Sequence, residues 1–144
     1  MDDAGARSKL AVVGYDGSKA GERGAARAAE LLVPGGTLLL VGVEVEAYSG
    51  GALSESLIEP GEQGAIQDAV ARAGERFSER EGVRVETVVL RGDTATVLVE
   101  LADRRGADLI VVGRRGRDFA ARVVLGSVAQ RVVESARCDV LVVA

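Results

Sequence analysis

The sequence predicts an α/β protein in which one open parallel sheet is covered by helices on both faces. Short, almost continuously apolar segments alternate along the chain with segments whose small and apolar residues recur at helical spacing. Such uniformly apolar strands favour a sheet that is buried on both faces, and strict alternation of strand and helix is typical of parallel sheets. The chain has 144 residues. We therefore expect residues 1–144 to form a single domain.

The first part of the chain is expected to contain two strands and one helix. Residues 9–15 are rich in valine and leucine and predict a strand, and residues 18–32 have small and apolar residues at helical spacing. Pro34 and the glycines after it are expected to stop this helix. Residues 37–47 are apolar at first and then alternating, which predicts a second strand. Residues 48–64 are rich in glycine, serine and glutamate and are interpreted as a long loop.

The rest of the chain repeats the alternation. Each expected helix has one apolar face, and each expected strand is short and rich in valine. The expected helices cover residues 65–81, 94–106 and 127–137, and the expected strands cover residues 83–90, 107–113 and 139–144.

Composition excludes several classes of function. There are 18 basic and 22 acidic side chains, and the net charge of −4 argues against nucleic acid as a partner. The sequence contains no histidine, which rules out catalytic triads and histidine-containing zinc sites. A single cysteine, no apolar run long enough to span a membrane and a polar, acidic start without signal-peptide pattern favour the cytoplasm.

Two of the expected strands end in the same way. One ends in Val-Val-Gly at Gly14 and continues to Asp16, and another ends in Val-Val-Gly at Gly113 and continues through several arginines to Gly116. Ligands of open parallel sheets bind beyond the carboxyl ends of the strands, where the strand order reverses. If these two strands are neighbours, their loops form the two lips of one crevice.

Asp16 has two interpretations. The sequence Asp-Gly-Ser before a helix is a capping signal, in which Asp16 or Ser18 accepts hydrogen bonds from the first helical amides. Alternatively, the Asp16 carboxylate binds a ribose hydroxyl, or a metal ion through water.

The loop after Gly113 has the composition of an anion site. Gly113 and Gly116 allow backbone amides to form a concave nest, and Gly126 and Ser127 then open a helix whose first amides favour negative charge. The glycines could instead serve only as turn residues, and the arginines of the loop could simply be solvated. The sequence has neither a Walker A loop nor the glycine-rich turn of a dinucleotide-binding fold.

These residues resemble the ATP-binding branch of the universal stress protein family, whose signature is Gly-x2-Gly-x9-Gly-Ser/Thr. Gly113, Gly116, Gly126 and Ser127 match that signature without a gap. The segments VVGYDGS, LLLVGVEV, LADRRGADLIVVGRRGR and LGSVAQRVVESARCDVLVVA are also similar to the family, so the resemblance covers nearly the whole chain.

The resemblance implies a Rossmann-like fold of the adenine nucleotide alpha hydrolase type, with strand order 3-2-1-4-5. It also implies ATP with Mg²⁺ or Mn²⁺, and a homodimer joined through the final strand at residues 139–144. By matching position, Asp16 would hold the ribose or a hydrated metal, Val43 the adenine, and the signature residues the phosphates. The complete set of candidate nucleotide-binding residues is Gly14, Tyr15, Asp16, Val43, Val112, Gly113, Arg115, Gly116, Gly126, Ser127 and Val128.

Four positions depart from the family pattern. Gly42 stands where a histidine is common and Arg114 where a small polar residue is common, and both are expected to alter ligand preference. Asp139 replaces a usual proline before the last strand and is expected to affect where that strand starts. Arg122 lies in a stretch that is usually apolar or small.

The predicted function is that of an ATP-binding universal stress protein that acts as a regulatory or stress-response module. No general base is evident beside the expected phosphates, so at most weak ATP hydrolysis is expected and no catalytic residue is assigned. Two alternatives stay open. One is a dimeric interaction module of the same fold that binds no nucleotide, and the other is a slow ATPase or phosphoryl transferase.

Overall fold

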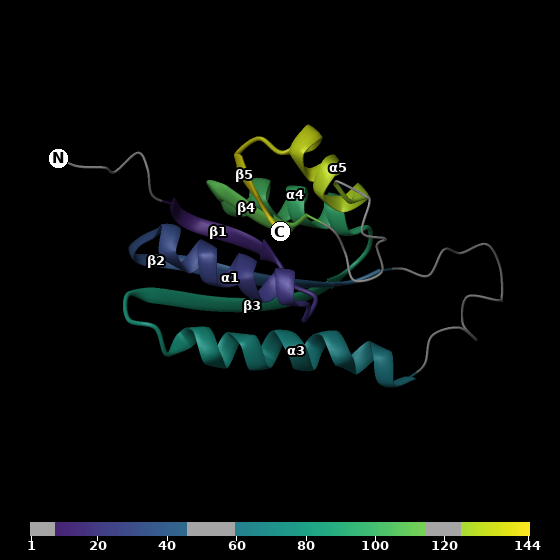
Figure 1. Cartoon of the computed structure of the whole chain (residues 1–144), viewed down its shortest axis with the longest axis horizontal. Helices are drawn as coiled ribbons and strands as arrows, with labels where there is room; N and C mark the ends of the chain where they lie inside the picture. Colours follow the sequence, from purple (N-terminus) through teal and green to yellow (C-terminus); the bar gives the residue numbers. More distant parts are fainter. Residues whose placement is uncertain (1–7, 46–59, 115–124) are drawn as a thin grey trace.

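A five-stranded parallel sheet forms the centre of the molecule (Figure 1). The computed structural model describes residues 8–45, 60–114 and 125–144. The strand order is β3-β2-β1-β4-β5, and every neighbouring pair is parallel, so the predicted topology is confirmed. The strands are β1 (Ser8–Gly14), β2 (Leu32–Glu44), β3 (Val83–Arg91), β4 (Leu109–Gly113) and β5 (Asp139–Val143).

Helices cover both faces of this sheet, as predicted. The helices are α1 (Lys19–Leu31), α3 (Pro60–Ser78), α4 (Thr94–Arg105) and α5 (Ser127–Ser135). One hydrophobic cluster joins one face of the sheet to α1 and α3, and a second cluster joins the other face to α4 and α5. The central strands β1, β2 and β4 are therefore covered on both faces, which explains their continuous apolar runs, whereas the edge strand β3 begins with alternating partly buried and exposed side chains.

Two boundaries differ from the prediction. β2 begins at Leu32, directly after α1, whereas the second strand was expected to begin at residue 37, after Pro34 and the glycines. Leu32 pairs with Ser8, and a register shift then absorbs the Pro-Gly-Gly stretch, in which Gly35 has a φ of +83°. α3 begins at Pro60, inside the predicted loop, because proline suits the first position of a helix. The rest of that predicted loop, residues 46–59, lies outside the described residues.

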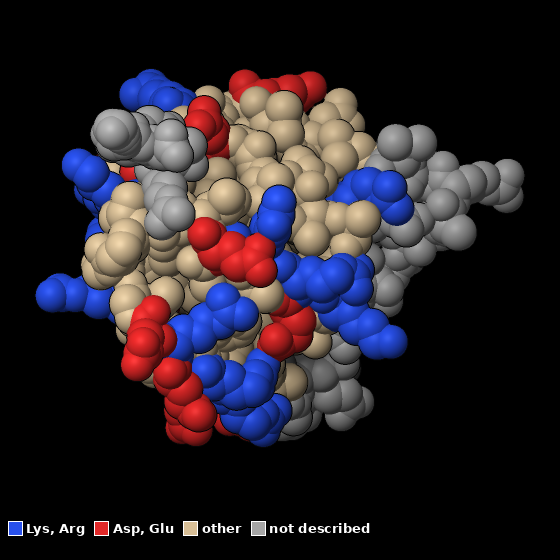
Figure 2. All heavy atoms as spheres, turned by 60° about the vertical axis from the view of Figure 1, so that its left-hand side comes forward, with Lys and Arg blue, Asp and Glu red and all other residues tan. Residues whose placement is uncertain are grey.

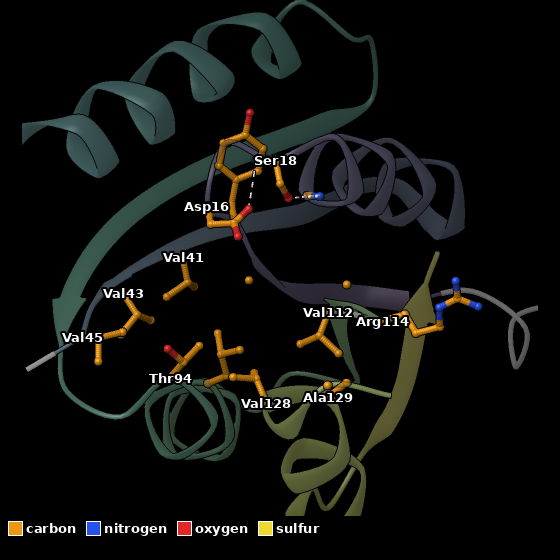
Figure 3. A pocket seen from close by; sticks show the side chains of 16 residues that line it. Asp16, Ser18, Val41, Val43, Val45, Thr94, Val112, Arg114, Val128 and Ala129 are labelled. Atoms are coloured by element: carbon orange, nitrogen blue, oxygen red, sulfur yellow. Dashed lines mark hydrogen bonds between the residues drawn. The ribbon is translucent and has the colours of Figure 1, made fainter. Parts of the chain in front are cut away.

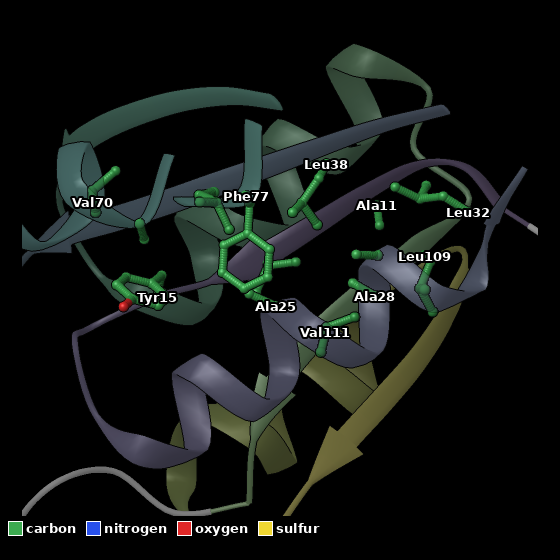
Figure 4. Packing of buried hydrophobic residues seen from close by; sticks show 14 residues of the cluster. Ala11, Tyr15, Ala25, Ala28, Leu32, Leu38, Val70, Phe77, Leu109 and Val111 are labelled. Atoms are coloured by element: carbon green, nitrogen blue, oxygen red, sulfur yellow. The ribbon is translucent and has the colours of Figure 1, made fainter. Parts of the chain in front are cut away.

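The cluster under α1 and α3 is built from small residues on the helices and large ones on the strands (Figure 4). Ala25 and Ala28 of α1 are fully buried against β1 and β4, while Phe77 of α3 packs among Tyr15 and Leu38. Because alanine adds little bulk, α1 lies close to the sheet, and the leucines and valines of the strands supply most of the buried apolar area.

α3 approaches the sheet through glycines. A Cβ atom placed on Gly42 of β2 would lie 2.6 Å from Cγ2 of Ile66 and 2.8 Å from Cγ2 of Val70, both in α3. A Cβ atom on Gly74 of α3 would lie 2.6 Å from Cγ2 of Thr87 in β3. Real Cβ atoms do not reach such distances, so the contact between α3 and the sheet requires glycine at both positions.

Charges of both signs are interspersed on the face where the strands begin (Figure 2). Arg105 and Glu86 form an ion pair with a closest distance of 3.0 Å, and Asp108 accepts a hydrogen bond from the backbone amide of Lys9. Within the described ranges, no helix has the length and apolarity needed to cross a membrane.

Candidate functional site

A cavity of about 210 Å³ opens beyond the carboxyl ends of β1, β2 and β4 (Figure 3). Its walls come from these strands, from the turn between β1 and α1, and from the first turns of α4 and α5. β1 and β4 are neighbours, with Val13 paired to Val111, so the two loops expected to form one crevice do leave the sheet side by side. The strand order reverses at this pair, which is where open parallel sheets bind ligands.

Most of the predicted site residues line this cavity. Ser127 begins α5 but is exposed and does not line the cavity. Arg115, Gly116 and Arg122 lie outside the described residues. The predicted residues in the cavity wall are Gly14, Tyr15, Asp16, Val43, Val112, Gly113, Gly126 and Val128.

The turn between β1 and α1 reconciles the two interpretations of Asp16. Ser18 is the N-cap of α1, and its side chain accepts a hydrogen bond from the amide of Gly21 at 3.1 Å. One oxygen of Asp16, Oδ1, accepts a hydrogen bond from the amide of Ser18 at 2.9 Å. Oδ2 of Asp16 accepts no hydrogen bond from another described residue. The capping network therefore orients Asp16 and still leaves one carboxylate oxygen for a ligand.

The two ends of the cavity differ in chemistry. Val43, Val45 and Thr94 lie together at one end, whereas Arg114 lies at the other end (Figure 3). Gly113 and Gly126 are part of the wall, and the amide of Gly126 donates to the carbonyl of Arg114 at 2.7 Å. An apolar end suits a flat ring, whereas glycines admit a bulky anion close to the backbone.

The N-terminus of α5 differs from those of α1 and α4. Side chains of Ser18 and Asp93 cap the other two helices, whereas the N-cap of α5 is Gly126, which makes no side-chain hydrogen bond. Val128 and Ala129, in the first turn of α5, line the cavity. The first amides of α5 are thus not used by a cap and lie beside the cavity, where helix N-termini stabilise anions.

Tyr15 anchors the lip that contains Asp16. Its ring packs in the cluster under α1 and α3, and its hydroxyl donates a hydrogen bond to Glu22 of α1 and accepts one from Arg76 of α3 at 3.2 Å. Arg76 also forms an ion pair with Glu22. Burial, followed by the hydrogen bond to Glu22, raises the pKa of the Tyr15 hydroxyl. The residue before Asp16 is therefore held by two helices at once.

A second polar network joins the other two helices. Asp93, the N-cap of α4, accepts two hydrogen bonds from Arg131 of α5, at 2.8 and 2.7 Å, and further ones from the amide and hydroxyl of Thr96. The hydrogen bond from Arg131 is the largest cause that holds the pKa of Asp93 well below its usual range. This pair fixes the separation of α4 and α5 next to the cavity.

We expect Arg131→Gln to lower the thermal midpoint by about 2 °C at neutral pH and low salt, a modest effect because the pair is half exposed. The folded-state pKa of Asp93 is depressed, so its stabilisation is present above the unfolded pKa of about 3.9 and is lost as the pH falls. Thermal melts should show that the difference in thermal midpoint between the wild type and Arg131→Gln disappears at low pH or in 1 M salt.

Arg137→Gln is the matched control for this prediction. Its Nε lies 4.0 Å from Asp103, and its side chain is 85% exposed. We expect its thermal midpoint to match that of the wild type at every pH. An Arg131→Gln variant that keeps its full deficit at low pH would contradict the role assigned to Asp93.

Three departures from the family pattern, Gly42, Arg114 and Asp139, are now placed. Gly42 does not line the cavity, because it faces Ile66 and Val70 of α3. Gly42 is therefore not a wall residue of the cavity, and an effect of Gly42 on ligand preference stays a prediction. Arg114 does line the cavity. Asp139 is the first residue of β5, so the missing proline does not delay the start of that strand.

Several wall residues were not predicted from the sequence. Val41 of β2 and Val45, directly after β2, alternate with Val43, so the period of two could have indicated them. Leu98 and Thr94 are four residues apart on one face of α4, but helical periodicity alone assigns Leu98 to the core. The further unpredicted wall residues are Ser18, Gly21 and Ala129, whereas Arg114 was expected to affect ligand preference without being assigned to the site.

The described residues contain no group of three or more acidic or cysteine side chains that could hold a metal ion. Among the described residues, Asp16 is the one carboxylate in the cavity wall. A single carboxylate fits a largely hydrated Mg²⁺ whose remaining ligands are phosphate oxygens, and it does not fit a metal held by protein alone.

The fold and the position of the cavity define the class of protein. A parallel sheet of order 3-2-1-4-5, with a cavity where the order reverses, is the arrangement of adenine nucleotide alpha hydrolase-like α/β proteins. The chain belongs to the universal stress protein family, whose sequence model matches residues 8–144.

Individual relatives agree with this assignment. A universal stress protein of Thermus aquaticus is 34% identical over 140 residues, which cover 94% of this chain and 98% of that relative. Universal stress protein MJ0531 of Methanocaldococcus jannaschii is 42% identical over 91 residues, which cover 63% of this chain and only 50% of that relative.

Solved structures agree at the level of the fold. Universal stress protein UspA from Lactobacillus plantarum superimposes with a TM-score of 0.83 at 21% identity, covering 96% of this chain and 99% of that chain. A universal stress protein solved in complex with cAMP has a TM-score of 0.69 at 27% identity, covering 94% of this chain and 96% of that chain.

Proposed function

We propose that the protein binds an adenine nucleotide, ATP in the first instance, in the cavity between β1 and β4 and acts as a nucleotide-dependent regulatory module. The observation that supports this most strongly is the polarity of the cavity. One end is formed by valines, the Asp16 carboxylate lies on one lip, and the uncapped N-terminus of α5 lies beside Gly113 and Gly126. Base, ribose and phosphates each find a suitable environment in this arrangement.

The glycine signature of the sequence supports binding of the phosphates in this cavity. Gly113 and Gly126 lie in the cavity wall, and Gly116 belongs to the same signature. A relative that is 27% identical was solved with cAMP, which supports adenine nucleotides as the ligand class. Asp16 would bind the ribose or, through water, a Mg²⁺ or Mn²⁺ ion on the phosphates.

The proposal does not include efficient catalysis. Asp16 is the only carboxylate that the described part of the chain places in the cavity wall, and the Oδ1 atom of Asp16 is already hydrogen-bonded to the Ser18 amide. Phosphoryl transfer needs a positioned nucleophile in addition to charge neutralisation. A phosphoryl transferase would lose turnover in Asp16→Asn while it kept its binding.

We expect nucleotide-free protein to bind ATP more tightly with Mg²⁺ than without it. Acid denaturation of the purified protein followed by mass spectrometry identifies any nucleotide that co-purifies. Isothermal titration then measures ATP affinity with and without Mg²⁺. Gly116→Val should reduce this affinity at least 100-fold, because a β-branched side chain blocks approach of a phosphate and disfavours a positive φ.

Three results would contradict the proposal. The first is wild-type protein that shows no heat of ATP binding and no competition with a fluorescent ATP analogue. The second is a folded Gly116→Val variant that binds ATP with wild-type affinity. The third is a higher ATP affinity without Mg²⁺ than with it. The first result would favour the alternative of an interaction module that binds no nucleotide.

We also propose that the protein forms a homodimer through β5, which is an edge strand of the sheet. Leu141, Val142 and Val143 are only partly buried in the single chain. The opposite edge strand, β3, carries the exposed charged residues Arg84 and Glu86, which oppose pairing with another chain. An apolar edge such as β5 lacks this protection and can pair antiparallel with its own copy around a two-fold axis.

A further inference from the structure

The apolar end of the cavity contains one hydroxyl that has no structural role within the described chain. Thr94 lies in the cavity wall together with Val43 and Val45 (Figure 3). It is the first residue of α4, but it does not cap the helix, because Asp93 is the N-cap and its side chain accepts the hydrogen bond from the Thr96 amide. No described residue forms a side-chain hydrogen bond with Thr94.

Thr96 shows what a structural threonine looks like in the same turn. Its hydroxyl donates to Asp93 at 2.7 Å and accepts from Arg131 at 3.4 Å, and it is exposed and does not line the cavity. Residues two apart on a helix point to different sides, whereas residues four apart share a face. Thr94 shares its face with Leu98, which also lines the cavity.

A hydroxyl in this position affects which ligands the apolar end accepts. A ligand ring that covers Thr94 removes water from the hydroxyl, and an uncompensated buried hydroxyl costs free energy. A ring with a hydrogen-bonding edge compensates that cost, whereas a hydrocarbon ring does not. The valines supply the faces that contact a flat ring, and Thr94 supplies a donor and an acceptor at its edge.

We propose that the Thr94 hydroxyl hydrogen-bonds the edge of the nucleotide base and is a specificity-determining residue of the cavity. This inference rests on the proposed nucleotide function and adds to it a particular contact at the end remote from Arg114. The bond is direct and involves one ring nitrogen or the exocyclic amino group of adenine.

Thr94→Val tests the contact because valine keeps the shape of threonine and removes the hydroxyl. Titrations with ATP, adenosine and inorganic tripolyphosphate separate the base from the phosphates. We expect Thr94→Val to weaken binding of ATP and adenosine about fivefold, which corresponds to one net hydrogen bond. Tripolyphosphate binding should not change. Thr96→Val is the matched control, and it should bind all three ligands as the wild type does.

Analogues of ATP identify the atom that is contacted. 1-Deaza-ATP, 3-deaza-ATP and 7-deaza-ATP each lack one ring nitrogen, and purine riboside triphosphate lacks the amino group. One of these four analogues should bind the wild-type protein more weakly than ATP does. The same analogue should bind Thr94→Val as tightly as ATP binds that variant, because the analogue and the substitution remove the same hydrogen bond.

The outcomes distinguish this inference from the proposed function. Wild-type protein that binds neither ATP nor adenosine overturns both. ATP binding that Thr94→Val leaves unchanged overturns the inference alone. The inference also fails if Thr94→Val weakens tripolyphosphate equally, because the variant then alters the whole cavity, or if none of the four analogues shows coupling. A thermal melt confirms that each variant is folded.

Discussion

Gly42→Val is expected to lower the free energy of unfolding by about 2–3 kcal/mol, as overpacking of a close contact does. A Cβ at this position would lie 2.6 Å from Ile66 Cγ2 and 2.8 Å from Val70 Cγ2. Both neighbours are β-branched residues in a helix. Such residues have one strongly preferred χ1 rotamer, so a change of rotamer cannot relieve the contact. α3 would therefore have to move away from β2. Urea denaturation measures the effect.

The choice of valine makes this result interpretable. Valine has a high preference for strands, so a loss of stability in Gly42→Val cannot come from strand propensity. Gly64→Ala is the control within α3, because its added Cβ meets nothing within 4 Å and alanine favours the helix by about 0.8–1 kcal/mol. Adding Ile66→Ala and Val70→Ala to Gly42→Val should cost less than the sum of the separate changes. Strict additivity would contradict the proposed collision.

Val142→Pro is expected to convert the proposed homodimer to monomers. Arg114 donates its amide to the carbonyl of Val143 at 2.7 Å, so Val143 directs its backbone groups toward β4. Neighbouring residues of a strand direct their N–H and C=O groups to opposite sides, so Val142 presents its own to the free edge. Proline in place of Val142 removes one N–H donor from the free edge. It leaves every hydrogen bond between β5 and β4 in place.

Sedimentation at micromolar concentration measures this effect. Val142→Thr keeps both the amide and the β-branched shape, so it should remain dimeric. Leu141→Pro would remove an inward donor, so it should destabilise the pairing of β4 and β5 within one chain. A wild-type monomer, or an undiminished dimer in Val142→Pro, would contradict the proposed interface.

The apolar pattern was sufficient to predict the fold class because the central strands are apolar on both faces, whereas the strand order was predicted from the family resemblance. Leu38, Leu39, Leu40 and Val41 are all at most 2% exposed, and such a run has few other stable placements in a chain of this length. The register shift at the start of β2 could not be predicted. Pro34 and Gly35 form a local irregularity in a strand, and the same residues also favour a turn that ends a helix.

The cavity was predicted in part. Gly14, Asp16 and Gly113 could be placed because they follow apolar strands, and the ends of neighbouring parallel strands meet at one edge of the sheet. Thr94 and Gly42 depend on tertiary packing instead. Whether Thr94 faces the cavity depends on how α4 packs against the sheet, and the side of β2 covered by α3 decides which contacts Gly42 makes.

The strand order also has a consequence for how the chain folds. β1, β2 and β3 pair with neighbours in sequence, and so do β4 and β5, whereas the pairing of Val13 with Val111 joins distant parts of the chain. Closing this long loop costs the most chain entropy, so the two segments are expected to dock late in folding. The cavity lies across that junction, with Asp16 on one side and Gly113 on the other. A ligand that contacts both sides would hold the segments together and slow their separation during unfolding.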